Sequence, residues 1–373
     1  ISIAETTIIL QGGKYLQIDG IELDIGQTHL RLAESARIVA RTGKIRKDMR
    51  LHMPLCCDTR TGKPGERTQG EAHMSMKQQH VLAGYIAALV ACLIGVGWQI
   101  TTRSGVTSNG LGPVDLALLR YGLPGLVLLP VWWRVGLVPR SVPIRITLAV
   151  VLGMGLPFGL LVMTGARFAP ISHMAAILPG AAPLLVGLMA ALVLREQLSP
   201  RRLAGWAVII IGIAVMFHQA LGTGGGDAWQ GDLLFLAAAM IWAVYTVAFR
   251  QSGLGPWQAA AVANGWSMLI VIPAWLLLQD GAMLSLARTA PDMLVLQVVF
   301  QGILAGLIGL WVYGYAVTHA GAVQAAAIGA LVPALSAGGG VLILGEGMGP
   351  AAIVGVIAVS LGVLLTVTAR PVS

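Results

Sequence analysis

The chain has 373 residues, of which 56% are apolar and 11% charged, and its formal net charge is +8. Soluble domains carry about a quarter charged residues, so this composition and a mean hydropathy of +0.80 exclude an ordinary soluble enzyme and indicate a membrane protein. Only three cysteines are present, two of them adjacent, which excludes a disulfide framework and makes structural zinc or redox chemistry unexpected.

The charged residues divide the chain into a tail and a body. Residues 1–77 form a charged N-terminal tail with every lysine, 12 of the 24 Lys and Arg and 9 of the 16 acidic residues. Period-two alternation at 6–10 and 15–25 is compatible with strands and a small β-rich module there, but about 40 residues without strong core runs are marginal for independent folding. The sequence from Met76 is typical of a natural start, so we expect residues 1–75 to be an upstream extension. A gene that starts at Met76 should then still give active protein.

Ten apolar runs follow the tail. An α-helical membrane span needs about 20 mostly apolar residues, and the connections between the runs are short and carry glycine, proline or charge. We therefore predict an all-α integral membrane protein with ten transmembrane helices. The runs cover 81–101, 113–133, 145–166, 171–194, 203–219, 231–249, 257–278, 293–317, 322–344 and 350–368.

Arginine positions predict the orientation of these spans. If the N-terminus is inside, the inner loops and the C-terminus receive eight arginines and the outer loops receive three. Cytoplasmic loops retain positive charge, so we expect both termini in the cytoplasm. The net charge then marks orientation, and no nucleic-acid partner is expected.

The second half of the body repeats the first. Residues 159–212 align with 309–362 at a constant offset of 150. The matches that carry most weight are Pro183/Pro333, Glu196/Glu346, Pro200/Pro350, Gly205/Gly355 and Gly212/Gly362. The two glycines of each copy lie seven residues apart on one helix face, where they would let a neighbouring helix approach closely.

Five spans per copy is an odd number, so the second copy is expected to sit inverted in the bilayer relative to the first. Inverted repeats are an architecture of secondary transporters, with the solute site near the midplane between the halves. The predicted organisation is a tail at 1–77, a first five-helix repeat at 78–219, a linker at 220–230 and a second repeat at 231–369.

Two motifs carry a family resemblance. The first copy reads Ala-Pro-Ile-Ser-His-Met-Ala-Ala at 169–176 and Leu-Arg-Glu-Gln-Leu-Ser-Pro at 194–200, and the second has Leu-Gly-Glu-Gly-Met-Gly-Pro at 344–350. With the matched prolines and glycines, this pattern resembles the EamA family of the drug/metabolite transporter superfamily over about residues 81–368. The second copy departs from the first in having no Arg that matches Arg120.

The resemblance implies export or exchange of small metabolites such as amino acids across the bacterial inner membrane, with both termini cytoplasmic. The expected partners are a small-molecule substrate and the lipid bilayer, and a homodimer is left open. A lipid-linked sugar or nucleotide-sugar carrier of the same superfamily is an alternative, as is a non-transporting membrane factor.

Polar and aromatic side chains within the runs are the candidates for substrate binding. A charged group deep in a span costs at least about 2.5 kcal/mol on insertion scales, so Arg120 should face the protein interior or water. It would act as the counter-ion of a substrate carboxylate or form a structural pair with Asp115. Trp98 and Tyr245 match at the offset that pairs Arg103 with Arg250, which suggests two symmetry-related groups that line a central cavity. The full set predicted to bind substrate is Trp98, Gln99, Arg120, Tyr245, Asn264 and Gln301.

Other residues receive structural predictions or remain secondary candidates. Glu196 and Glu346 are expected to be loop or cap determinants, and Trp132 and Trp133 to belong to an interfacial aromatic belt. His173 and His319 lie near loop ends, where a solvated imidazole needs no special role, although a histidine can relay protons. Tyr313, Tyr315 and Gln324 are further polar candidates.

Several chemical motifs are absent from the sequence. There is no GxxxxGK[ST] phosphate loop, no HExxH and no GxSxG. We therefore expect no enzyme activity, no catalytic residue, no metal site and no cofactor. The energy for transport would come from a gradient or from downhill export.

Overall fold

The computed structural model describes residues 2–10, 14–22, 31–32, 38–39, 66–108, 110–195, 197–222, 226–277 and 286–369. Side chains are described from His80 onward within these ranges, apart from Leu194. The chain divides into two units, Ile1–Ala72 and His73–Ser373.

The N-terminal unit contains a small antiparallel sheet. Strands β1 (Ser2–Leu10) and β2 (Lys14–Glu22) form a hairpin in which Ser2 lies opposite Glu22 and Leu10 opposite Lys14. Two short strands, β3 (Arg31–Leu32) and β4 (Ile38–Val39), both pair with β2. The strands predicted from period-two alternation are confirmed, with the end of the second predicted run, residues 23–25, lying outside the described residues.

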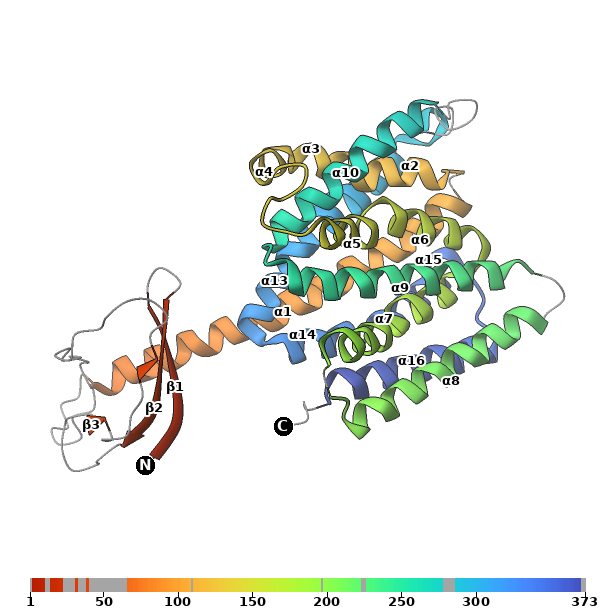
Figure 1. Ribbon diagram of the computed structural model, residues 1–373. Helices are drawn as coiled ribbons and strands as arrows, with labels where there is room; N and C mark the ends of the chain where they lie inside the picture. Colours follow the sequence, from red (N-terminus) through yellow and green to blue (C-terminus); the bar gives the residue numbers. More distant parts are fainter. Residues whose placement is uncertain are drawn as a thin grey trace. The chain divides into compact units, whose positions relative to one another are not determined.

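The second unit is a bundle of helices (Figure 1). Its first half contains the part of α1 (Glu66–Thr107) from His73 onward, and then α2 (Pro113–Ala117), η1 (Leu118–Gly122), α3 (Leu123–Val127), α4 (Leu129–Val135), α5 (Ile144–Met154), α6 (Leu156–Phe168), α7 (Ile171–Leu194) and α8 (Pro200–Gly222). Its second half contains α9 (Ala228–Ser252), α10 (Pro256–Leu277), α12 (Pro291–Gln297), η2 (Val298–Ile308), α13 (Gly309–Ala320), α14 (Ala322–Gly329), α15 (Val332–Leu344) and α16 (Pro350–Val367). Five of these helices begin with proline. Proline is favoured at the first helical position because a backbone N–H there would have no partner within the helix, so its absence costs nothing.

Nine helical segments of the described chain are long and apolar enough to cross a membrane, and a bent pair makes ten if it counts as one span. The bent pair joins residues 113–127 to 129–135 at an angle of 66°. The break falls at Leu128, two residues before Pro130, and a proline interrupts helical hydrogen bonding. The ten predicted runs are therefore confirmed, the second of them as a broken span.

The first helix of each half packs against the third span of the other half. On one side α9 packs against α5 and α6, where a Cβ added to Gly231 would meet the backbone of Ala169. On the other side a Cβ added to Gly84 of α1 would meet the backbone of His319 and Ala320. Gly84 and Gly231 are 147 residues apart, and Ala169 and His319 are 150 apart, so the repeat relates the two contacts. The first helices of the two repeats therefore make equivalent contacts with the opposite repeat.

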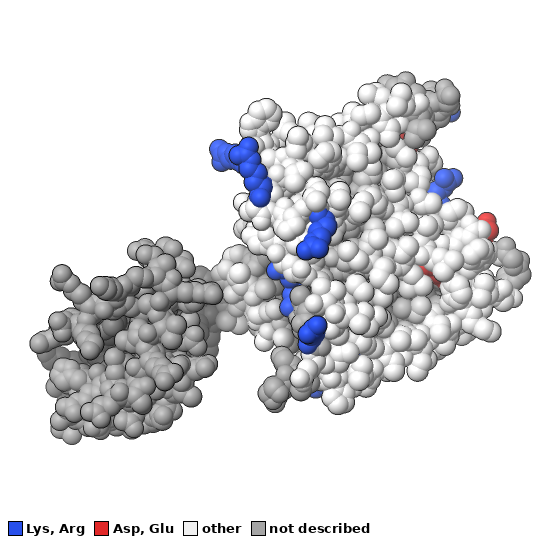
Figure 2. All heavy atoms as spheres, in the orientation of Figure 1, with Lys and Arg blue, Asp and Glu red and all other residues white. Residues whose placement is uncertain are grey.

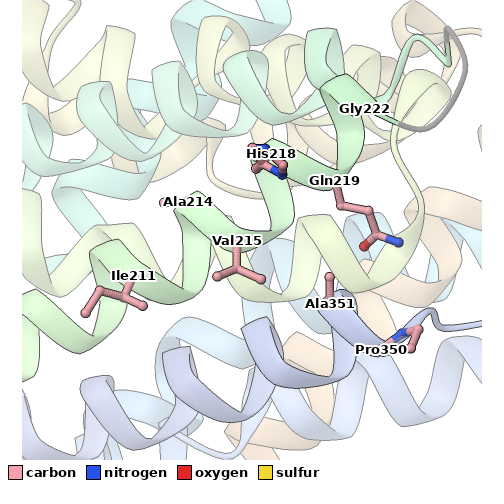
Figure 3. Close-up of a pocket in the computed structure, with 8 residues that line it drawn as sticks. All are labelled: Ile211, Ala214, Val215, His218, Gln219, Gly222, Pro350 and Ala351. Carbon is pink, nitrogen blue, oxygen red and sulfur yellow. The ribbon is translucent and has the colours of Figure 1, made fainter.

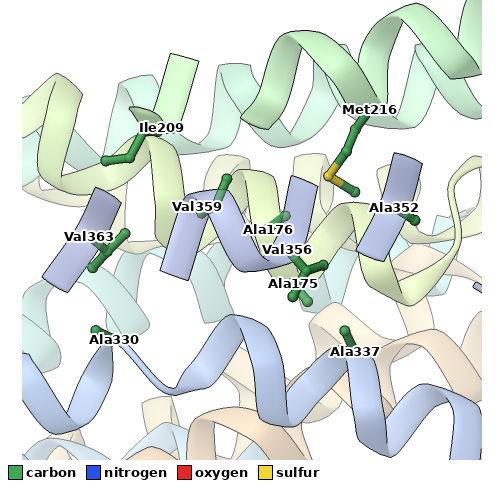
Figure 4. Packing of buried hydrophobic residues seen from close by; sticks show 10 residues of the cluster. All are labelled: Ala175, Ala176, Ile209, Met216, Ala330, Ala337, Ala352, Val356, Val359 and Val363. Atoms are coloured by element: carbon green, nitrogen blue, oxygen red, sulfur yellow. The ribbon is translucent and has the colours of Figure 1, made fainter. Parts of the chain in front are cut away.

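The four glycines singled out by the sequence repeat lie in one helix crossing. A Cβ added to Gly205 would lie 2.8 Å from the carbonyl oxygen of Gly362, and a Cβ added to Gly362 would lie 2.8 Å from the carbonyl oxygen of Gly205. For the Gly212–Gly355 pair the two distances are 3.0 and 3.1 Å. Helices α8 and α16 thus meet backbone to backbone. This confirms the predicted close approach of a neighbouring helix at these glycines, although which helix it would be was not predicted. Figure 4 shows the Val, Ile, Met and Ala side chains that fill the space beside this contact.

The surface of the bundle is that of a multi-pass membrane protein. Large apolar side chains such as Leu342 and Ile343 are exposed. On the face in Figure 2 charged side chains are sparse, and the basic ones gather mainly toward one end of the helices. Trp133 is 85% exposed, whereas Trp132 is buried against Trp266. Placing Trp132 in an interfacial belt was wrong, because successive helical residues point about 100° apart and only one of the two can face outward.

Candidate functional site

Gln301 is the centre of a polar cluster formed by α1, η1 and η2. Its Oε1 accepts a hydrogen bond from Trp98 Nε1 at 2.9 Å, and its Nε2 donates to Thr102 Oγ1 at 2.9 Å. Its backbone oxygen accepts from Arg120 Nη1 at 3.3 Å. The structure therefore brings together three of the six predicted binding residues, Trp98, Arg120 and Gln301. We call Trp98, Thr102, Arg120 and Gln301 the polar cluster.

The guanidinium of Arg120 lies against aromatic faces. Its Cζ is 5.4 Å from the ring centroid of Trp98 and 6.0 Å from that of Tyr121, within the range of cation–π attraction. A guanidinium has five N–H donors, and the hydrogen bond to Gln301 uses one. Asp115, the structural partner suggested by the sequence, accepts hydrogen bonds from Gly112 N and Trp275 Nε1.

Two of the four residues of the polar cluster lie in π-helical turns. Arg120 is in η1 and Gln301 is in η2, and these two segments pack against each other. π-helical turns are rare and frequent at functional sites. The approach is close because a Cβ on Gly302 would lie 3.0 Å from Leu119 O and one on Gly306 would meet the ring of Pro124. The glycines were visible in the sequence, but the π-helical turns were not predicted.

An aromatic row continues from the polar cluster into the second repeat. Ring centroids are 6.4 Å apart for Trp98 and Phe158, 5.1 Å for Phe158 and Trp242, and 5.0 Å for Trp242 and Tyr245. Phe249 extends the row by a further 5.9 Å step. The predicted residues Trp98 and Tyr245 are thus linked through Phe158 and Trp242, which sequence reasoning missed. A signal for Trp242 was its position three residues before Tyr245, on the same helix face.

The remaining predicted residues make no described contact with the polar cluster. Gln99 is buried, and its Oε1 has no hydrogen-bond partner among the described residues. Asn264 is buried and donates to Ala260 O of its own helix at 2.8 Å. Of the secondary candidates, Tyr313 is 47% exposed and Gln324 is also exposed, so neither faces the bundle interior.

Gln297 is a further polar residue that the sequence analysis missed. It is fully buried one helical turn before Gln301, and its Nε2 donates to Thr101 O at 2.8 Å. A Cβ on Gly105 would lie 2.9 Å from that same Nε2. Gln297 and Gln301 therefore tie α1 to the third span of the second repeat over two successive turns. The pattern Gln-x-x-x-Gln at 297–301 was the available signal, because residues four apart share a helix face.

Glu346 joins three helices at one end of the bundle. Its Oε1 pairs with Arg103 Nε, and its Oε2 accepts a hydrogen bond at 2.8 Å from the N–H of Ile171, the first residue of α7. Arg103 also donates to Ala166 O. The predicted cap role of Glu346 is confirmed, since it satisfies a backbone donor at a helix N-terminus. Its repeat equivalent, Glu196, lies outside the described residues.

Replacing Glu346 with Ala should destabilise the protein. The change leaves Arg103 and the Ile171 N–H without this acceptor, and a lost hydrogen bond to a charged group costs about 1.5 to 3 kcal/mol. Unfolding of the purified protein in detergent, followed by tryptophan fluorescence, would measure the loss. Asp292→Ala is the matched control, because Asp292 is an exposed acidic residue in the first turn of α12. Equal stability of the two variants would contradict the cap role.

His173 differs from the sequence-based expectation. Its side chain is only 7% exposed, and its Nδ1 lies 2.8 and 3.1 Å from the two carboxylate oxygens of Asp232. The prediction of a solvated imidazole was wrong, because the first turns of α9 cover the start of α7. His319 is half-buried and stacks on Tyr315 with ring centroids 3.9 Å apart.

A hollow of about 710 Å³ lies between the end of α8 and the start of α16 (Figure 3). Its described lining is mostly apolar, with His218 and Gln219 as the polar exceptions. None of the six residues predicted to bind substrate is among the described residues that line it. The polar cluster remains the better candidate for the site of a polar solute.

The sequence pattern of the EamA-like transporter family matches residues 82–218 and again residues 229–368. The chain belongs to this family. The first match covers the spans from α1 to α8 and the second those from α9 to α16, so the five-span repeat seen in the sequence is the family unit. The protein is a multi-pass membrane transporter of the drug/metabolite transporter superfamily.

Individual relatives agree with this membership. A protein of Salmonella typhimurium named "Probable amino-acid metabolite efflux pump" is 26% identical over 296 residues, which are 76% of this chain and 94% of the relative. An "Uncharacterized transporter" of Clostridium kluyveri is 25% identical over 178 residues, 46% of this chain and 56% of that protein. A crystal structure described only as "Crystal structure of protein" is 18% identical with a TM-score of 0.51, over 76% of this chain and 95% of its own, which shows a shared fold.

Proposed function

We propose that this EamA-like transporter exports or exchanges small polar metabolites with amino-acid chemistry across the inner membrane by alternating access. The observation that carries the proposal is Arg120, held near the middle of the bundle by Gln301 of the second repeat and stacked on Trp98. In an inverted-repeat transporter the interface between the repeats is where the solute binds.

The polar cluster fits a carboxylate. A guanidinium binds a carboxylate through two parallel N–H···O bonds, and the bond that Arg120 donates to Gln301 O uses one of its five N–H donors. The Arg120 guanidinium lies over the ring of Trp98, with its Cζ 5.4 Å from the ring centroid. The aromatic row beside it offers an apolar surface to the rest of an amino-acid-like solute. Among the described residues, Arg120 is the only Lys or Arg near the middle of a span.

The name of the Salmonella typhimurium relative supports the same solute class. The arginine distribution supports cytoplasmic termini, since the loops on the side of the C-terminus hold most of the arginines in the body. In this orientation the Arg103–Glu346 contact lies toward the external side, because α1 ends there and α7 begins there.

Everted membrane vesicles test the proposal. Vesicles from cells that overproduce the protein should accumulate a radiolabelled mixture of L-amino acids faster than vesicles from cells that lack it. Competition by single unlabelled amino acids would then identify the preferred solute. If the two kinds of vesicle take up every amino acid at the same rate, the proposed solute class is wrong.

Trp98→Phe should slow this transport about five- to tenfold. The change keeps an aromatic ring beneath Arg120 but removes the hydrogen bond to Gln301, and a neutral hydrogen bond is worth about 1 kcal/mol or slightly more. Trp133→Phe is the matched control, because Trp133 is exposed on the outside of the bundle and should tolerate the change. Equal transport rates in the two variants, at equal protein level, would exclude Trp98 from the site.

A further inference from the structure

The hydroxyl group of Tyr121 is a buried polar group that no described residue satisfies. Tyr121 follows Arg120 in η1, and its side chain is 2% exposed. The hydroxyl oxygen has no hydrogen-bond partner among the described residues. Keeping a buried polar group without a partner is costly, so such a group in a folded protein calls for an explanation.

The hydroxyl lies where the polar cluster meets the aromatic row. The Cζ of Arg120 is 6.0 Å from the ring centroid of Tyr121 and 5.4 Å from that of Trp98. Gly159 of α6 leaves room for the hydroxyl, because a Cβ added there would collide with the hydroxyl oxygen. Phe158, the residue before Gly159, stacks with Trp98 at 6.4 Å between ring centroids. The same few side chains therefore surround the guanidinium and the hydroxyl.

The polar groups that approach the hydroxyl can only donate hydrogen bonds. They are the guanidinium of Arg120 and the backbone N–H of Gly159, and neither is an acceptor. They can share the oxygen of Tyr121 but cannot take its proton. The rest of the ring packs in an apolar cluster with Leu156 and Met163. The O–H of Tyr121 is thus a donor without an acceptor.

Each acceptor of the polar cluster already receives a hydrogen bond. Gln301 Oε1 accepts from Trp98 Nε1, and Gln301 O accepts from Arg120 Nη1. Thr102 Oγ1 accepts from Gln301 Nε2 and donates to Trp98 O at 2.7 Å. The polar cluster and Tyr121 together lack an acceptor, so a solute that binds here has to bring one.

We propose that Tyr121 donates its O–H to the carboxylate of the transported solute, beside Arg120, and that this bond makes the site select carboxylates over carboxamides. The proposal rests on the export function proposed above and adds a residue that sets the solute class. A carboxylate has about four lone-pair sites, so it can accept from the guanidinium and the hydroxyl at once. An O–H···O⁻ bond is charge-assisted and roughly twice as strong as a neutral one.

Carboxamides are the informative contrast. A carboxamide has nearly the shape of a carboxylate, but an NH₂ group replaces one oxygen. Beside Arg120 and Tyr121 this NH₂ group would face other donors and leave hydrogen bonds unmade. The hydroxyl is shielded from water, so water does not replace a bond that is unmade there. A site that offers only donors therefore rejects the amide as well as attracting the carboxylate.

Tyr121→Phe removes the hydroxyl and keeps the ring. Everted vesicles that take up the radiolabelled amino-acid mixture are challenged with single unlabelled L-amino acids and with their carboxamides. The selectivity is the half-inhibitory concentration of the carboxamide divided by that of the amino acid. It should fall about three- to tenfold in Tyr121→Phe, because the bond lost to a carboxylate is stronger than the bond lost to an amide. An unchanged selectivity would overturn the proposal.

Tyr313→Phe is the matched control. Tyr313 is 47% exposed on the outside of the bundle, so removing its hydroxyl should leave both half-inhibitory concentrations at the wild-type values. A purely structural role of Tyr121 would weaken the amino acid and its carboxamide by the same factor. Equal weakening of the two compounds in Tyr121→Phe would therefore also count against the proposal.

A second measurement needs no transport. The full chain is labelled with ¹³C at the Cζ atoms of tyrosine and placed in lipid nanodiscs, where the resonance missing from Tyr121→Phe belongs to Tyr121. L-alanine and propionate should shift this resonance, because each brings a carboxylate that accepts from the hydroxyl. Propionamide should shift it much less. A Tyr121 resonance that neither carboxylate moves would overturn the proposal.

The two measurements separate the role of Tyr121 from the proposed function. If propionate shifts the Tyr121 resonance while the vesicles take up no amino acid, Tyr121 binds carboxylates and the transported solute is a different carboxylate. If the vesicles take up amino acids while Tyr121→Phe keeps the wild-type selectivity, the function stands and the role given to Tyr121 is wrong.

Discussion

Replacing Arg120 with Ala is expected to reduce the apparent affinity for an amino-acid-like solute about 30-fold or more while the protein still inserts and folds. Removing one partner of a buried, hydrogen-bonded charge pair costs about 2 kcal/mol or more, and about 1.4 kcal/mol corresponds to a factor of ten. The measurement is uptake of the radiolabelled amino-acid mixture in everted vesicles, divided by the amount of inserted protein on an immunoblot.

Two further variants serve as controls for the Arg120→Ala result. Arg120→Lys keeps the charge but loses the planar fork that binds a carboxylate and stacks on Trp98, so transport should fall to an intermediate level. Arg167→Ala removes an exposed arginine and should leave transport unchanged. Unchanged uptake in Arg120→Ala would remove Arg120 from the site. A loss of inserted protein would instead show that its contacts with Gln301 and Trp98 are structural.

The spans could be predicted from the sequence because hydropathy is a local property. Each apolar run is bounded by proline, glycine or charge, and these residues end helices for reasons that need no tertiary context. A close helix approach at the four glycines was also predictable, since glycines at a repeated spacing carry a packing signal, but the pairing of α8 with α16 was not predicted. The break of the second span at Leu128 was not predicted, because prolines within membrane helices are often tolerated and the sequence does not say which one bends the chain.

The partners of polar residues could not be predicted in the same way. Trp98, Arg120 and Gln301 were all identified as polar groups within spans, but nothing local states that they meet. The His173–Asp232 contact was missed because its two residues lie in different repeats, 59 positions apart, and have no matched pair in the alignment of the copies. Asn264 was selected for its amide, yet that amide donates to its own helix. A polar side chain in a span can satisfy itself locally, so its presence alone does not indicate a binding role.

Replacing Gly212 with Leu should destabilise the whole bundle. A Cβ at this position would lie 3.0 Å from Gly355 O, from Ala358 Cβ and from Val359 Cγ2, so a larger side chain must push α8 away from α16. Forcing extra carbon atoms into a packed contact costs about 1 to 3 kcal/mol, and here the obstacle includes backbone. Thermal unfolding of the purified protein in detergent would show a lower midpoint.

Gly338→Leu is the control that separates packing from helix propensity. Gly338 lies within α15, and a Cβ there would meet no heavy atom within 4 Å. Both substitutions gain about 0.8 to 1 kcal/mol of helix propensity, so only Gly212→Leu should lower the midpoint. The milder Gly212→Ala should transport normally per folded molecule, because α8 and α16 contribute no residue to the polar cluster or the aromatic row. Equal midpoints for the two leucine variants would mean that the four-glycine crossing does not hold the repeats together.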